Sequence, residues 1–191
     1  SSYLGLHKQR LDAAKTCVNI APKQARLHAS LGGAYANAAQ YSQALTAYDC
    51  AAELAPEDAN IQLQRGHMLK TLGQREECEQ AFRKSIALRK LNGPAYWALA
   101  DLKNFDFTAA DINLMESIAN DKSAPPEHRS QAAFALANSL ERRDFFDRAF
   151  AFYQLANQLR PNANFNADQF ERHCEESREV FNASLMSYQT K

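Results

Sequence analysis

A pattern of small and large residues returns along this chain after 34 residues. Its first copy has, in order, His28, Leu31, Gly32, Tyr35, Ala44, Tyr48 and Pro56. The second copy keeps small residues at Gly66 and Cys78 and an aromatic residue at Phe82. Small residues allow the two helices of a hairpin to approach closely, large ones fill the space between hairpins, and proline stops a helix. The pattern therefore predicts helical hairpins arranged in tandem.

Later copies follow the pattern less strictly. A third begins with Tyr96, Leu99 and Ala100, but its second half departs from the pattern. After a three-residue insertion near Pro125 and Pro126, a fourth copy starts 105 residues after the first, which is three periods plus three. This order and spacing resemble those of tetratricopeptide repeats. The resemblance implies an all-α fold, a right-handed superhelical solenoid in which the first helix of each hairpin lines a concave groove.

The register of the repeats predicts a domain organisation. The expected units are the second helix of a truncated preceding repeat (1–24), two complete repeats (25–58 and 59–92), a degenerate repeat with an insertion (93–128), a fourth repeat (129–163) and a C-terminal helix (164–191). The first unit is expected because Pro22 lies 34 residues before Pro56. The last helix has one apolar stripe, with which it would cap the array. The alternative is that it links the array to a further domain beyond Lys191.

Composition and charge restrict the classes of partner. The chain has 22 basic and 22 acidic residues, and no stretch concentrates either sign, so we expect neither nucleic acid nor a membrane surface as a partner. No run approaches the roughly 18 apolar residues of a spanning helix, which favours a soluble protein. The four cysteines lack metal-ligand spacing and suit small buried side chains in a reducing compartment. The expected location is therefore cytoplasmic.

Candidate catalytic and ligand motifs are missing from the sequence. The glycine-containing segment 31–34 falls inside a repeat helix, so it does not form a phosphate-binding loop. His128 and His173 have no partner at metal-ligand spacing. No nucleophile, base and orienting acid would be brought together by spacing alone. We therefore expect this chain by itself to be no enzyme, and to use neither a cofactor nor a metal.

Three segments resemble the repeat region of bacterial tetratricopeptide-repeat sulfotransferase proteins. They are RGHMLKTLG at 65–73, AYWALADLK at 95–103 and FALANSLE at 134–141, and the likeness runs over about 25–181. The resemblance implies a sulfotransferase domain in the same polypeptide, after Lys191, that takes a sulfuryl group from 3′-phosphoadenosine 5′-phosphosulfate. This chain would then be a non-catalytic scaffold that docks that domain or presents its acceptor. The alternative is a free-standing adaptor that assembles a protein complex.

The repeat register also predicts which side chains project into the groove and contact a protein or peptide. These candidate binding residues are Leu63, His67, Lys70, Trp97, Asp101, Asn104, Phe134 and Asn138. They combine apolar anchors with polar groups, which suits an extended peptide or a helix. His67 and Lys70 lie three apart on one helix face and could hold an anion together. The alternative is that Trp97 and Phe134 are packing residues and the others form a solvated surface.

Overall fold

The computed structural model describes the backbone of residues 2–103 and 105–160 and the side chains of residues 7–103 and 105–160. The chain divides into two units, Ser1–Leu159 and Arg160–Lys191. The fold described below is that of the first unit. The C-terminal helix predicted at 164–191 lies outside the described residues.

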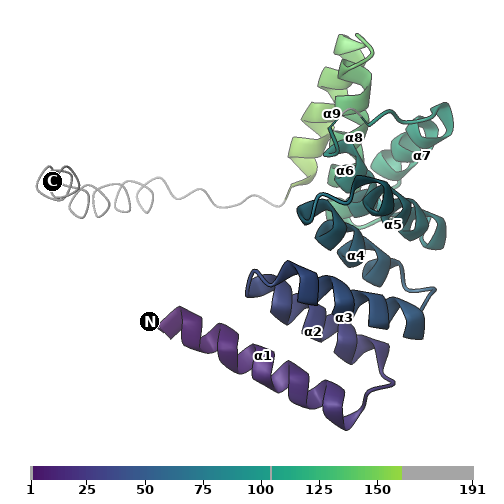
Figure 1. The fold of residues 1–191 in the computed structure, drawn as a ribbon. Coiled ribbons are helices and arrows are strands. Elements are labelled where there is room, and N and C mark those ends of the chain that lie inside the picture. Colours follow the sequence, from purple (N-terminus) through teal and green to yellow (C-terminus); the bar gives the residue numbers. More distant parts are fainter. Residues whose placement is uncertain (1, 104, 161–191) are drawn as a thin grey trace, which may run out of the picture. The chain divides into compact units, whose positions relative to one another are not determined.

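Every regular element of the described residues is an α-helix, which confirms the predicted all-α fold (Figure 1). The helices are α1 (Ser2–Ile20), α2 (Ala25–Asn37), α3 (Tyr41–Leu54), α4 (Ala59–Thr71), α5 (Arg75–Leu88), α6 (Gly93–Ala100), α7 (Ala109–Asn120), α8 (Pro126–Glu141) and α9 (Phe146–Leu159). Three hairpins, α2 with α3, α4 with α5 and α8 with α9, are the most extensively packed helix pairs. None of the described helices is both long and apolar enough to cross a bilayer.

The three hairpins share one turn geometry. The turn residues Ala39, Gly73 and Asp144 have φ values of 55°, 76° and 62°, the left-handed conformation that commonly ends a helix. The next residue in each turn donates its backbone N–H to the carbonyl five positions earlier, at 2.9–3.0 Å. These bonds satisfy carbonyls that the end of the first helix would leave without a partner. The equivalent position in the third repeat, Phe107, does not have a positive φ, so that repeat lacks this turn.

Glycine allows the two helices of a hairpin to pack closely, as the repeat pattern predicts. A Cβ atom built on Gly32 would lie 2.9 Å from the Tyr48 ring, and one built on Gly66 would lie 2.4 Å from the Phe82 ring. Both distances are well below the roughly 3.5–4.0 Å at which carbon atoms pack favourably. Tyr48 is buried and Phe82 is fully buried. The predicted close approach of the two helices is therefore present in these two hairpins, whereas Tyr48 and Phe82, expected to fill the space between hairpins, contact the glycine of their own hairpin.

The third repeat opens because two phenylalanines enter it. Helix α6 ends at Ala100, and the segment before α7 places the buried rings of Phe105 and Phe107 in the main core. These rings meet edge to face, with centroids 4.9 Å apart. Helices α6 and α7 barely contact each other, and both pack on α8 instead (Figure 1). Helix α6 thus has eight residues where α4 has thirteen, and the aromatic side chains of the segment that follows it belong to the core.

Three arginines hold this segment in place. Arg142 donates to the carbonyl of Phe105 at 2.8 Å, and Arg143 donates to the carbonyl of Phe107. Arg83 lies over the Phe105 ring, 5.2 Å from its centroid, and pairs with Asp111 at 2.6 Å. Backbone carbonyls in a non-helical segment need donors when they are turned toward the protein. Arg142 and Arg143 supply these donors at the end of α8, and Arg83 of α5 contacts the segment through the Phe105 ring.

The cysteines differ in burial, which corrects one expectation. Cys78 is fully buried, Cys50 is half-buried and Cys17 is exposed, and all three are free thiols. The prediction that Cys17 fills a buried small-residue position is therefore wrong. Helix α1 packs chiefly on α2, and Cys17 lies on a part of α1 that this contact does not cover. Cys174 lies outside the described residues.

Candidate protein-binding site

The side chains predicted to line the groove lie on three neighbouring helices. Helix α4 carries the predicted residues of the second repeat, α6 those of the third and α8 those of the fourth. Helix α6 contacts α4 and packs extensively on α8. We call the surface formed by His67, Lys70, Trp97, Asp101, Phe134 and Asn138 the first-helix face.

Aromatic rings connect the helices at one end of the first-helix face. The ring of Trp97 on α6 lies 5.6 Å from that of Phe134 on α8, which in turn lies 6.2 Å from Tyr153 on α9. Trp97 is nevertheless 40% exposed, whereas Phe134 and Tyr153 are half-buried. An indole that is packed on one side and open on the other is well suited to contact a ligand. The sequence did not predict that Tyr153 extends this group.

Tyr153 is held in place by a hydrogen bond. Its hydroxyl donates to a carboxylate oxygen of Glu141 at 2.7 Å. Burial, together with the hydrogen bond and the negative charge of Glu141, raises the pKa of Tyr153 to about 12. The phenol therefore remains a neutral donor at physiological pH. The hydrogen bond to Glu141 and the ring contact with Phe134 together position the Tyr153 side chain.

A second part of the first-helix face is polar. Lys70 near the end of α4 forms an ion pair with Asp101, the residue that follows α6. His67 packs edge-on against the Phe82 ring, with centroids 5.3 Å apart. Burial and the nearby Lys70 charge lower the pKa of His67, although Asp101 opposes this shift. The imidazole is therefore neutral at pH 7, and Lys70 is already paired, so these two residues do not form a strongly cationic anion site.

The remaining predicted residues contribute less to this surface. Leu63 is only 7% exposed and belongs to the main hydrophobic core. Asn138 is half-buried on α8. Asn104 lies outside the described residues. The structure therefore brings together two groups among the predicted residues, the Trp97–Phe134 pair and the Lys70–Asp101 pair.

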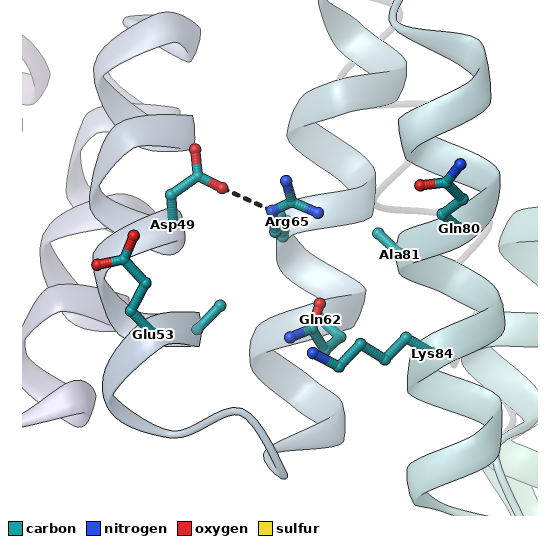
Figure 2. Close-up of a pocket in the computed structure, with 8 residues that line it drawn as sticks. Asp49, Glu53, Gln62, Arg65, Gln80, Ala81 and Lys84 are labelled. Atoms are coloured by element: carbon teal, nitrogen blue, oxygen red, sulfur yellow. Dashed lines mark hydrogen bonds and ion pairs between the residues drawn. The ribbon is translucent and has the colours of Figure 1, made fainter.

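The structure also contains a cavity that the repeat register did not indicate. It has a volume of about 470 Å³ and lies between α3, α4 and α5 (Figure 2). Its lining residues are Asp49, Ala52, Glu53, Gln62, Arg65, Gln80, Ala81 and Lys84. Arg65 donates to Asp49 at 2.6 Å, which connects the second hairpin to the first. A sequence signal existed in the four-residue spacing of Asp49 and Glu53, which places both carboxylates on one face of α3.

Metal ligands do not gather in the part of the chain that the structure describes. No group of three or more histidine, cysteine, aspartate or glutamate side chains there could hold a metal ion.

Known proteins share the repeat and the fold. Residues 59–90, which contain α4 and α5, match the tetratricopeptide repeat family. A human protein, Protein O-mannosyl-transferase TMTC1, is 26% identical over 163 residues, which cover 83% of this chain. The chain spans only 18% and 12% of the lengths of the curated relatives it matches. None of the proteins named here is described as a sulfotransferase.

Two solved structures resemble this chain in fold. The crystal structure of MamA gives a TM-score of 0.62 at 16% identity and covers 83% of this chain and 91% of MamA. YrrB, described as a tetratricopeptide-repeat protein with an unusual peptide-binding site, gives 0.57 at 13% identity, over 85% of this chain and 82% of YrrB. The chain therefore contains a tetratricopeptide repeat at residues 59–90 and has the helical-hairpin fold of tetratricopeptide-repeat proteins.

Proposed function

We propose that this chain is a binding scaffold that holds an extended segment of a partner protein on its first-helix face. The observation that carries the proposal is the indole of Trp97, which is 40% exposed although its ring packs against Phe134. Stacked helical hairpins present such surfaces to other proteins. An apolar side chain of the partner would cover the indole, and polar groups of the partner would meet the Lys70–Asp101 pair.

The peptide mode is favoured by the chemistry of the surface. A rigid aromatic anchor beside a paired lysine and aspartate provides both an apolar contact and groups that fix orientation. The description of YrrB as a peptide-binding protein of similar fold supports the same mode. The aromatic anchor and the Lys70–Asp101 pair are sufficient for binding, since a binding scaffold needs no catalytic group. The three free thiols of the described residues fit a reducing compartment such as the cytoplasm.

The wider role has two candidate forms. In the first, the scaffold serves a sulfotransferase domain of the same polypeptide, as the resemblance of segments 65–73 and 95–103 implies. A match to part of a much longer human transferase is compatible with a repeat region inside a transferase polypeptide. In the second, the chain acts as an adaptor between separate proteins. A coding frame that continues past Lys191 into a phosphate-binding loop would favour the first form, and an immediate stop codon would favour the second.

The experiment uses Trp97 as its own probe, because it is the only tryptophan of the chain. A peptide array would select binding sequences, and each selected peptide would be titrated while the emission of Trp97 is recorded. We expect a blue shift, since the indole loses contact with water when a peptide covers it. A parallel titration by calorimetry gives the affinity for variants without tryptophan.

The variants test whether the first-helix face is the binding surface. Trp97→Ala combined with Lys70→Glu should weaken binding at least tenfold, because a buried aromatic anchor commonly contributes more than about 1.4 kcal/mol. Tyr41→Ala is the matched control, since Tyr41 is 37% exposed but lies at the start of a second helix, α3. Equal affinity of the double variant and the wild type, with helicity unchanged by circular dichroism, would exclude this surface.

A further inference from the structure

We propose that the cavity between α3, α4 and α5 is a second binding site, which takes a peptide segment with adjacent acidic and basic side chains. The cavity joins two hairpins, because α3 belongs to the first and α4 and α5 belong to the second (Figure 2). A ligand held there would therefore contact both repeats. This inference does not depend on the function proposed for the first-helix face.

The cavity and the first-helix face lie on different sides of α4. Gln62 and Arg65 line the cavity, whereas His67 and Lys70 belong to the first-helix face. At 3.6 residues per turn, the mean directions of these two pairs differ by roughly 140° around the helix axis. The other walls of the cavity are second helices, α3 and α5. A partner on the first-helix face would thus leave the cavity accessible.

The two sides of the cavity carry opposite charges. Asp49 and Glu53 come from α3, and Lys84 extends from α5 on the opposite side (Figure 2). Arg65 on α4 is fixed by its 2.6 Å hydrogen bond to Asp49. Neither Glu53 nor Lys84 forms an ion pair or a side-chain hydrogen bond with another described residue. One unused carboxylate and one unused ammonium group therefore face the same cavity.

A nearly buried amide lies between these charges. Gln62 is only 2% exposed as a residue, but its amide atoms are not among the fully buried atoms without a partner, so they open onto the cavity that the residue lines. An amide at the wall of a cavity can exchange water for a ligand group that offers the same hydrogen bonds. A peptide backbone supplies both a donor and an acceptor, which are the groups that an unpartnered amide needs.

Size and charge together select the ligand class. A volume of about 470 Å³ is within the range of ligand-binding pockets, roughly 300–1,000 Å³. A simple anion that approached Lys84 would also meet the carboxylate of Glu53, and a simple cation would meet Lys84. A segment with neighbouring glutamate and lysine side chains satisfies both groups at once, while its backbone reaches Gln62. Charge complementarity therefore favours a mixed-charge peptide.

The test uses three capped hexapeptides and the isotope-labelled full chain. The probes are Gly-Ser-Glu-Lys-Ser-Gly, the same peptide with glutamine in place of glutamate, and the same peptide with glutamine in place of lysine. Binding is followed by the chemical shifts of backbone amides in α3, α4 and α5. We expect the mixed-charge peptide to bind about three- to fivefold more tightly than either neutralised peptide, which is the usual effect of one partly exposed ion pair.

Two variants assign the charges to the residues. Lys84→Gln should remove the preference for glutamate while leaving the affinity for the glutamine-containing peptide unchanged. Glu53→Gln should remove the preference for lysine in the same way. Lys122→Gln is the control, since Lys122 is exposed and lies outside the cavity, and it should change none of these affinities. Equal affinities for the three peptides, shifts confined to other helices, or equal weakening of all probes by Lys84→Gln would overturn the proposal.

Discussion

Gly66→Ala tests the packing of α4 on α5, because the added methyl group has no space. A Cβ atom at position 66 would lie 2.4 Å from one Phe82 ring carbon and 2.6 Å from another. The ring must therefore move by about 1 Å to reach ordinary contact. Phe82 is fully buried, so this movement disturbs its neighbours. Overpacking of this kind costs about 1–3 kcal/mol, whereas replacing a helical glycine by alanine gains up to about 1 kcal/mol.

Gly33→Ala provides the matched comparison. A Cβ atom at Gly33 would meet only the Tyr48 hydroxyl at 3.6 Å, which is ordinary contact. No steric clash then opposes the gain in helix propensity, so Gly33→Ala should raise the free energy of unfolding by about 0.5–1 kcal/mol. Gly66→Ala should lower it by about 1–2 kcal/mol.

Urea denaturation followed by circular dichroism measures the stability of both variants. The expected order of stability is Gly33→Ala, wild type, Gly66→Ala. Similar slopes of the unfolding free energy against urea would show that the variants differ in stability rather than in the extent of unfolding. If Gly66→Ala proved as stable as Gly33→Ala, the close contact with Phe82 would not exist and the packing argument would fail.

Three further predictions follow from the same helices. Phe82→Ala should lower the free energy of unfolding by about 3–5 kcal/mol in urea denaturation, because it removes a fully buried ring. Ala39→Gly should raise the free energy of unfolding by up to about 1 kcal/mol, and the melting temperature with it, since φ is 55° there and glycine adopts this conformation without steric cost. An unchanged or lower melting temperature would contradict this. Burial alone would raise the pKa of Asp111, but hydrogen bonds from Arg83 and Thr108 lower it below the usual value. The unfolded state then binds a proton at Asp111 more readily than the folded state does. The stabilisation that ionised Asp111 contributes is therefore complete above about pH 4 and is lost as the pH falls further. Between pH 5 and 3, the melting temperature of the wild type should accordingly fall more steeply with decreasing pH than that of Asp111→Asn. Equal slopes of melting temperature against pH would refute this assignment.

The sequence alone was sufficient to predict the helical hairpins, because their packing depends on local spacing. Gly66 precedes Phe82 by 16 residues, and the pair meets across one short turn. The same spacing occurs between Gly32 and Tyr48. A periodic pattern of this kind specifies which faces of neighbouring helices are apolar, so the fold class follows from it. The residues on the first-helix face could be nominated for the same reason, although Leu63 is mostly buried in the core.

Only the tertiary structure decided the features that depend on contacts between distant residues. Phe105 and Phe107 lie in a segment without repeat spacing, and their burial depends on arginines 36 and 37 residues later in the chain. The polar cavity requires side chains from three helices of two hairpins, and Gln62 and Lys84 belong to it through the packing of α4 against α3 and of α5 against α4. Local periodicity carries no information on such contacts, because each depends on where the chain returns in space. The spacing of residues thus predicts which helices pair, whereas the opening of the third repeat and the second candidate site arise from packing between residues far apart in the sequence.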